Sequence, residues 1–490
     1  MSVAVSTKKT IIQIPGLNAA LKRASGFPAG SIVGGRGAIQ SQQAVFTTTS
    51  VNQQVTYQTR HTIQRDCTDI QLLFSNSYDG EALPQNSIRL KTGIQIFGTS
   101  TVYPLLFNGL AETVIEPGGY KTSDPIGLEL AAGTLLTVRS RPKGTNIGDV
   151  WGLGKLTYTV NYEGSTADVD LTNANILITA VTKSNPAQLT TGTTKHNLST
   201  GDKIYITGAS GGAGWSGLNS SAGSPRTVTV IDAYNFTIPV DSSGFTGSYT
   251  VNTGYVGGVS DYNNVYCYQP TAILGTASPY VQPTVIIIGD SIAFGYPNNG
   301  SNSFIDRAID SVLPSVSIAV SGEELSGFVS VGGHLRRGFF MGLATLAIIQ
   351  YGTNDIKNGR SVSATQANFI EISRVCDIRG ISKKWVCTIP PLTTSTDSFA
   401  TAGNQTPGAY EANRVSMNNL LRANYRAWGF EYLIDVCSVC EVNSSNVLTQ
   451  NGGRWLTNGV AFYPTPEGVH PSNAICDLMA TLINPSLAKI

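Results

Sequence analysis

The chain has 490 residues, and its net charge of +1 with only 13% charged residues makes it neither strongly basic nor strongly acidic. No basic stripe interleaved with aromatic residues occurs, and no apolar run approaches the ~20 residues that span a bilayer, so we expect neither a nucleic-acid nor a membrane partner. The length allows two to four domains, and 52 glycines favour a β-rich chain with many turns.

Residues 1–37 show little periodicity and end in the glycine-rich sequence Gly34-Gly35-Arg36-Gly37. This segment is predicted to be an arm or attachment segment, through which other proteins could be bound. Its apolar stretch at residues 10–15 is short and is broken by Gln13 and Pro15, so no signal peptide is expected.

Short strands separated by turns dominate the next part of the chain. Residues 38–175 and 258–280 are predicted to form one β-sandwich, with strands such as 135–138 and turns such as 117–119.

A separate module is expected at residues 176–257, with strands at 204–208 and 228–232. The sequences at 197–203 and 232–237 resemble small β-barrel modules that are inserted in structural proteins of tailed phages. This resemblance implies a small β-barrel insert.

In residues 281–490 strands alternate with helices, which predicts a doubly wound, flavodoxin-like parallel sheet. The predicted strands are 285–288, 316–320, 347–350, 385–389 and 432–436. A long helix after Asn354 is expected to begin with a capping box of Ser363 and Gln366 and to end at Gly380.

The seven cysteines are an odd number scattered over the chain, so they do not predict a disulfide framework. Cys437 and Cys440 have the spacing of a metal or redox pair, but a zinc site would need a second pair and the motif closes the strand at 432–436. Buried structural thiols are therefore expected. With only four histidines in the chain, we expect no catalytic metal and no cofactor.

A candidate nucleophile lies where the apolar strand 285–288 ends in Gly289-Asp290-Ser291. Ligands of α/β sheets bind at the carboxyl ends of strands, and a serine there has the amides of the following helix nearby. The triplet alone is a weak signal. It gains weight from three later motifs, Ser321-Gly322, Gly352-Thr353-Asn354-Asp355 and Glu467-Gly468-Val469-His470-Pro471.

On these motifs, residues 281–490 resemble an SGNH hydrolase, the family of GDSL-type esterases, with Ser291, Gly322, Asn354 and His470 at the four name-giving positions. The helix at 410–428 is similar to the family's segment before its last strand, and the preceding β-sandwich resembles one found ahead of some SGNH domains. One departure concerns the residue three positions before the histidine, which is usually Asp in the family and is Glu467 in this chain.

The resemblance implies a role for each motif residue. Ser291 would be the nucleophile, and His470 the base that takes its proton and later returns it. Glu467 would fix the imidazole tautomer, although a Ser–His dyad helped by a backbone carbonyl stays open. The oxyanion hole would be formed by the backbone N–H groups of Ser291 and Gly322 and the side-chain amide of Asn354.

The remaining polar candidates have structural interpretations. Asp290 and Asp355 are expected to stabilise turns. His61, His196 and His334 are expected to lie at the surface or to serve packing.

The resulting hypothesis is a serine esterase that removes O-acetyl groups from a carbohydrate such as a host surface polysaccharide. It would act as part of a phage tail spike or fibre in the virion, or as a secreted protein, and the oligomeric state is left open. The alternative is a non-catalytic receptor-binding or structural virion protein built on the same fold. A lipase or thioesterase is a third possibility, whose acyl groove the loop 452–466 with Trp455 and Phe462 would line.

Overall fold

The computed structural model describes the chain between residues 32 and 484. Within these limits it leaves out residues 36, 39–40, 50, 53–55, 77–85, 97–101, 156–160, 164–175, 193–195, 197–199, 201–202, 221–223, 225, 233, 259–265, 278–282, 297–302, 311, 331–332, 335–336 and 382.

The C-terminal part contains a six-stranded sheet in which all pairs are parallel. Its strand order is β1 (Gly37–Ala38), β23 (Ser315–Ser317), β22 (Val285–Gly289), β24 (Leu346–Gln350), β25 (Lys383–Cys387) and β28 (Tyr432–Ile434). The chain runs from β22 to β23 on one side and then to β24 on the other. The loops after β22 and β24 therefore separate at a topological switch point, which is where open α/β sheets bind ligands.

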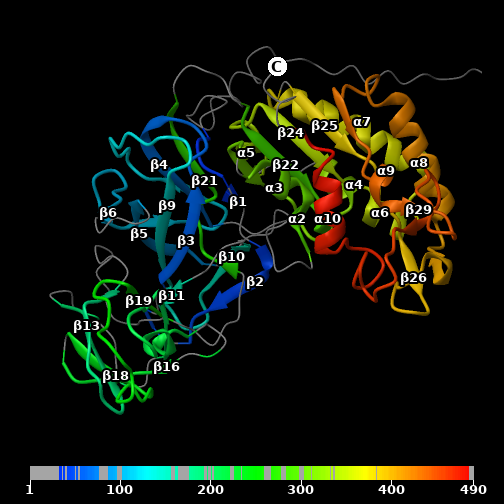
Figure 1. Cartoon of the computed structure of the whole chain (residues 1–490). Helices are drawn as coiled ribbons and strands as arrows, with labels where there is room; N and C mark the ends of the chain where they lie inside the picture. Colours follow the sequence, from blue (N-terminus) through cyan, green and yellow to red (C-terminus); the bar gives the residue numbers. More distant parts are fainter. Residues whose placement is uncertain are drawn as a thin grey trace, which may run out of the picture.

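Helices cover both faces of this sheet (Figure 1). They are α2 (Ser291–Phe294), α3 (Phe304–Ile309), α4 (Leu325–Val329), α5 (Arg337–Met341), α6 (Thr353–Lys357), α7 (Val362–Ile378), α8 (Glu411–Asn424), α9 (Cys437–Cys440) and α10 (Asn473–Ala480).

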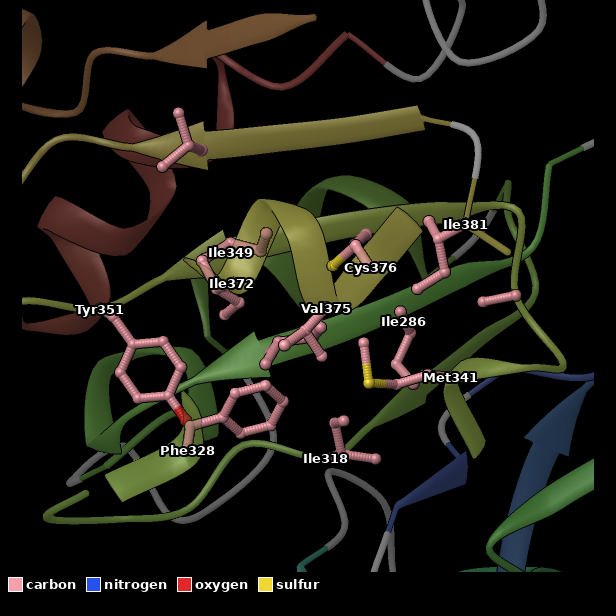
Figure 2. Close-up of a cluster of buried hydrophobic side chains, with 14 of the residues drawn as sticks. Ile286, Ile318, Phe328, Met341, Ile349, Tyr351, Ile372, Val375, Cys376 and Ile381 are labelled. Atoms are coloured by element: carbon pink, nitrogen blue, oxygen red, sulfur yellow. The ribbon is translucent and has the colours of Figure 1, made fainter. Parts of the chain in front are cut away.

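Strand β22 contributes to two hydrophobic cores because its side chains alternate between the faces of the sheet. Ile286 and Ile288 pack with Val375 and Met341 in the core shown in Figure 2, whereas Ile287 packs on the opposite face. The predicted parallel sheet is confirmed.

Two local predictions are wrong. Helix α7 begins at Val362 and is capped by Ser361, whose hydroxyl accepts from the Ala364 N–H at 3.2 Å, so Ser363 and Gln366 form no capping box. The Cys437-x-x-Cys440 motif forms the one-turn helix α9 and does not close the strand.

Among the helices of the described residues, none has the length and apolar character of a membrane span.

The N-terminal β region consists of antiparallel sheets from the strands before residue 164 and after residue 265. These strands are β2 (Ser41–Thr47), β3 (Thr56–Thr62), β4 (Cys67–Ser75), β5 (Ile88–Ile96), β6 (Val102–Pro104), β7 (Thr113–Ile115), β8 (Tyr120–Thr122), β9 (Leu135–Lys143), β10 (Val150–Lys155), β11 (Asn161–Glu163), β20 (Tyr266–Cys267) and β21 (Ala272–Ala277). The N-terminal β region is thus β-rich, as its many turns predict. Its arrangement as a sandwich stays a prediction.

The insert at residues 176–257 forms two four-stranded sheets around a hydrophobic core of its own, which includes the fully buried Trp215. Its strands are β12 (Ile176–Ile178), β13 (Ala180–Val181), β14 (Ala187–Thr190), β15 (Lys203–Thr207), β16 (Arg226–Thr227), β17 (Thr229–Val230), β18 (Asn235–Ile238) and β19 (Gly254–Gly258). The barrel stays a prediction.

The end of the expected N-terminal arm is built into the fold. Ile32 and Val33 are fully buried, and the Val33 N–H donates to the Ile273 carbonyl in β21 at 2.9 Å. Strand β1 then pairs with β23 of the six-stranded parallel sheet. Residues 1–31 of the expected arm lie outside the described residues.

Candidate active site

Ser291 is the first residue of α2, and only Asp290 separates it from the end of β22. Asp290 caps this helix, since its Oδ1 accepts from the Ile292 N–H at 3.0 Å. Gly289 is required at the turn because a Cβ there would lie 2.3 Å from the Gln350 carbonyl oxygen. The turn holds Ser291 with only 5% of its surface exposed.

His470 joins Ser291 to Glu467. Its Nε2 lies 2.7 Å from Ser291 Oγ, and its Nδ1 lies 2.5 Å from Glu467 Oε1. The same carboxylate accepts from the backbone N–H groups of His470 at 2.9 Å and Val469 at 3.2 Å. Burial favours a raised pKa for Glu467, but these hydrogen bonds outweigh it and lower the pKa below its ordinary value, so the carboxylate stays ionised.

The loop that carries His470 is anchored at Gly468. The Gly468 carbonyl accepts from the Trp455 indole N–H at 3.0 Å, and the Gly468 N–H donates to Thr465 Oγ1 at 2.8 Å. Gly468 has a φ of 91°, and a Cβ there would lie 1.8 Å from the Thr393 carbonyl oxygen. Trp455 is fully buried, so it does not line the acyl groove expected for a lipase.

The expected oxyanion-hole residues lie at neighbouring strand ends. Strands β22 and β24 pair up to Gly289 and Gln350, which places the turn before Asn354 beside Ser291. The Val320 N–H donates to the Gly289 carbonyl at 2.9 Å and brings the loop of Gly322 to the same edge. Gly322 has a φ of 82° and no atom within 4 Å of its Cβ position, so the space beside it is open.

Asn354 is held by its own amide, which donates to the Glu323 carbonyl at 3.0 Å. A primary amide has a second N–H, which remains as a donor for a substrate oxygen.

Asp290 and Asp355 have structural contacts, as expected. Asp355 accepts from the Leu325 N–H at 2.9 Å and so ties α6 to the start of α4. Asp290 is fully buried, and burial, helped by the nearby Asp355 and Glu323 charges, raises its pKa to about 8.

The other three histidines each contact a backbone carbonyl and none of the three contacts Ser291 or His470 in the bonds that follow. His61 contacts the Gly35 carbonyl at 3.2 Å, His196 that of Asp232 at 2.7 Å and His334 that of Phe328 at 2.9 Å.

Two features beside the site carry no motif in the sequence. The Tyr296 ring packs edge-on against the His470 ring, with 4.7 Å between centroids, and is 43% exposed. Glu323, which follows Gly322, forms a buried ion pair with Arg337. Single Tyr, Glu and Arg residues at irregular spacing give no sequence signal that could have found them.

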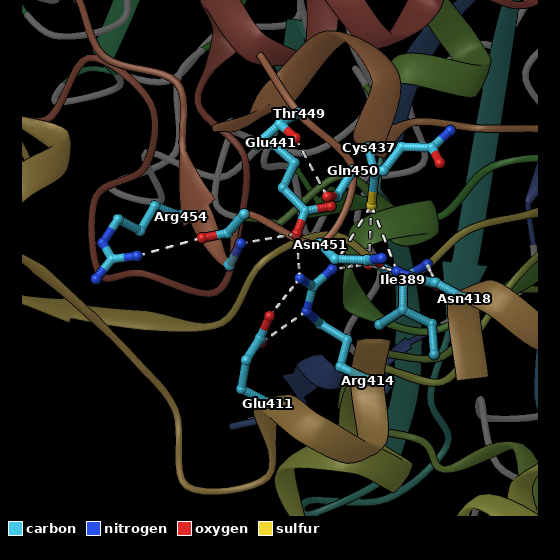
Figure 3. A network of polar contacts seen from close by, with 12 residues as sticks. Ile389, Glu411, Arg414, Asn418, Cys437, Glu441, Thr449, Gln450, Asn451 and Arg454 are labelled. Atoms are coloured by element: carbon cyan, nitrogen blue, oxygen red, sulfur yellow. Dashed lines mark hydrogen bonds and ion pairs between the residues drawn. The ribbon is translucent and has the colours of Figure 1, made fainter. Parts of the chain in front are cut away.

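A polar network under α8 fixes the chain after β25 (Figure 3). Arg414 Nη1 and Asn418 Nδ2 each donate to the Ile389 carbonyl at 2.8 Å, and the Cys437 thiol donates to it at 3.2 Å. Burial raises the pKa of this thiol to about 12, so it is an inert structural group. Within the described part of the chain, no group of three or more His, Cys, Asp or Glu residues could hold a metal ion.

Comparison with known proteins gives a family for the C-terminal region. Residues 287–475 match the model of the GDSL-like Lipase/Acylhydrolase family. No curated protein matches the chain.

Similar solved structures include a protein of the G-D-S-L lipolytic family from Desulfitobacterium hafniense, with 14% identity and a TM-score of 0.31 over 41% of this chain and 96% of that chain. A GDSL-like lipase from Bacteroides thetaiotaomicron has 18% identity and a TM-score of 0.30 over 42% and 88%. A carbohydrate acetylesterase family member from Sinorhizobium meliloti has 13% identity and a TM-score of 0.30 over 42% and 97%. The family match shows that the C-terminal region of the chain, residues 287–475, belongs to the GDSL-like lipase/acylhydrolase (SGNH) family, which implies an esterase or acylhydrolase.

Proposed function

We propose that the protein is a serine esterase that removes O-acetyl groups from a carbohydrate, with Ser291, His470 and Glu467 as its catalytic triad. The observation that supports the esterase assignment is a continuous chain of contacts. Ser291 Oγ lies 2.7 Å from His470 Nε2, and His470 Nδ1 lies 2.5 Å from Glu467 Oε1. Such a chain of contacts activates a serine hydroxyl and keeps the imidazole in the required tautomer.

In this mechanism Ser291 Oγ attacks the ester carbonyl carbon while His470 Nε2 takes the hydroxyl proton. Negative charge moves to the carbonyl oxygen, which the N–H groups of Ser291, Gly322 and Asn354 stabilise. The bond to the alcohol oxygen then breaks, and His470 gives its proton to that oxygen. A water molecule, deprotonated by His470, then attacks the acyl carbon. The bond from that carbon to Ser291 Oγ breaks, the acid leaves, and His470 returns the proton to Ser291 Oγ.

Tyr296 supports a carbohydrate on the leaving-group side. The imidazole must reach the alcohol oxygen that departs, so a ring that contacts His470 borders the space of that alcohol. An exposed tyrosine can pack its apolar face on a sugar ring and use its hydroxyl for hydrogen bonds. The resemblance of residues 176–257 to phage modules supports a place in the virion. The acetylated substrate would then be a polysaccharide on the surface of the host.

The test of the esterase is acetate release from a small aryl acetate and from acetylated polysaccharide, with Ser291→Ala beside the parent. We expect the parent to turn over both and the variant to lose roughly a million-fold in kcat, because the covalent step needs the hydroxyl. If the parent is no faster than Ser291→Ala on either substrate, the esterase proposal fails and the non-catalytic binding protein replaces it.

The test of the carbohydrate is the ratio of kcat/KM on the polysaccharide to that on the aryl acetate. Tyr296→Ala should lower this ratio about tenfold, whereas Tyr296→Phe keeps the ring and should retain most of it, since one lost stacking contact costs about 1 to 1.5 kcal/mol. A ratio that is unchanged in Tyr296→Ala would contradict the assignment of this ring to the sugar.

A further inference from the structure

Glu323 lies in a buried charged fork beside the oxyanion hole. Arg337 Nη1 and Nη2 donate to Glu323 Oε2 and Oε1 at 2.8 and 2.7 Å, and the Tyr351 hydroxyl donates to Oε2. Arg337 is only 2% exposed, and its guanidinium also lies over the Phe328 ring at 4.8 Å. A bidentate pair of this kind fixes direction as well as distance, because two parallel bonds leave the carboxylate no rotation.

The fork holds both loops that supply oxyanion donors. Glu323 is the neighbour of Gly322, and its own carbonyl accepts from Asn354 Nδ2 at 3.0 Å. Tyr351 is the first residue after β24 and leads through Gly352 to Asn354. Movement of the Glu323 side chain would therefore shift the Gly322 amide and the Asn354 amide together.

Arg337 belongs to α5, and α5 also touches the N-terminal β region. Two residues beyond Arg337, the Phe339 ring stacks on Tyr120 of β8 with 4.0 Å between centroids. Phe340 and Met341 of α5 also belong to the hydrophobic core that contains Leu274 of β21. A helix of five residues has few internal hydrogen bonds to hold its position, so these side-chain contacts set it.

We propose that α5 is a positioning element through which the N-terminal β region sets the oxyanion hole, along the path Tyr120, Phe339, Arg337 and Glu323. The inference rests on the proposed esterase. Arg337 is the positioning residue: it touches no reacting atom and acts through Glu323 on the amides of Gly322 and Asn354. The β region is then part of the catalytic apparatus and not only a carrier.

The experiment measures kcat and KM of the full chain on the aryl acetate, with active sites titrated by an aryl phosphonate that modifies Ser291. Arg337→Lys keeps the charge but loses the fork, and should lower kcat about 10- to 100-fold with KM within about threefold, because a misplaced oxyanion donor acts on the transition state. Tyr351→Phe, which removes only one hydroxyl, should lower kcat about 3- to 10-fold.

The link to the β region is tested by Tyr120→Ala, for which we expect about a 3- to 10-fold loss of kcat, restored by Tyr120→Phe because the ring stack is kept. Tyr234→Ala is the matched control, since Tyr234 is 36% exposed and lies in the 176–257 insert, and its kcat should equal that of the parent. The double variant Tyr120→Ala with Arg337→Lys should lose less than the product of the single losses, as expected for one path.

The acid limb of the pH profile should be the same in all these variants, since His470 and Glu467 are untouched. The proposal would be overturned if Arg337→Lys and Tyr351→Phe, after active-site titration, had the kcat of the parent. It would also be overturned if the loss of kcat in the double variant equalled the product of the two single losses. Absence of both turnover and phosphonate modification in the parent would instead refute the esterase on which the proposal rests.

Discussion

Glu467 reaches His470 with a side chain one methylene longer than the aspartate usual at this position in the family. Its Oε1 accepts from both the ring Nδ1 and the backbone N–H of His470, at 2.5 and 2.9 Å. The longer side chain thus folds back onto its own turn, and the positive φ of Gly468 makes that turn tight. Glu467 thus places a carboxylate oxygen beside the ring Nδ1, which is the position that the proposed triad requires.

We expect Glu467→Gln to lower kcat about 10²- to 10⁴-fold, because a neutral amide stabilises the imidazolium less and favours the wrong tautomer. Steady-state kinetics on the aryl acetate measures the loss. Glu371→Gln is the control, since Glu371 pairs with Arg374 on the outer surface of α7 and should leave kcat unchanged. A loss of less than about threefold in Glu467→Gln would leave a Ser–His dyad as the catalytic unit.

The secondary-structure elements around the site were predictable where one pattern dominates. Strands β22 and β24 are continuous apolar runs, and such runs form the buried centre of parallel sheets. Two serines two positions apart compete to start α7, and local sequence could not decide for Ser361 over Ser363. Strand β1 has only two residues and a partner far along the chain, so no local pattern marks it.

The residues of the candidate site also divide into those that the sequence could predict and those that it could not. Ser291, Gly322, Asn354, Glu467 and His470 lie in short motifs, and the fold brings these motifs to one edge. The Arg337 fork is assembled from three loops or helices, and its partners differ in type and spacing, so only the tertiary structure displays it.

The cap of α2 makes a prediction about pH. Burial raises the pKa of Asp290 to about 8, against about 3.9 for an unfolded chain. Between these values the folded state holds a proton that the unfolded state has lost, so the free energy of unfolding falls as pH rises, by up to about 1.4 kcal/mol per pH unit. Asp290→Asn cannot titrate and retains an oxygen for the Ile292 N–H. The variant should therefore gain stability over the parent from pH 5 to pH 7.

Amide hydrogen exchange of β22 and β24 at both pH values measures this gain. Asp397→Asn is the control, because hydrogen bonds from Thr401 and its neighbours lower the pKa of Asp397, and a lowered pKa affects stability only at more acidic pH. Equal pH dependence in the parent and Asp290→Asn would show that Asp290 is ionised in the folded protein.

At the scale of the whole molecule, the catalytic sheet is not complete within the C-terminal part. Its edge strand β1 comes from the N-terminal segment, and Ile32, Leu73 and Leu274 belong to the same hydrophobic core as Val316 and its neighbours. Removing the β region would leave β23 as an open edge above exposed apolar side chains, which favours association between chains.

A fragment of residues 281–490 should therefore form aggregates and unfold at a lower temperature than the full chain, as measured by size-exclusion chromatography and calorimetry. Replacement of residues 176–257 by a short Gly-Ser linker is the control, because that insert has its own core and its ends are paired through β12 and β19. A monomeric fragment 281–490 with the melting temperature of the full chain's catalytic region would contradict this view.

Strand β1 also has a consequence for synthesis on the ribosome. Gly37 leaves the ribosome roughly 280 residues before its partner Val316, a delay of about 15 to 60 s at ordinary translation rates. Because the Val33 N–H donates to the Ile273 carbonyl in the folded protein, we expect this segment to be held in place once β21 has emerged. We therefore expect β1 to be in place before β23 emerges, so that β23 pairs with an edge that is already positioned.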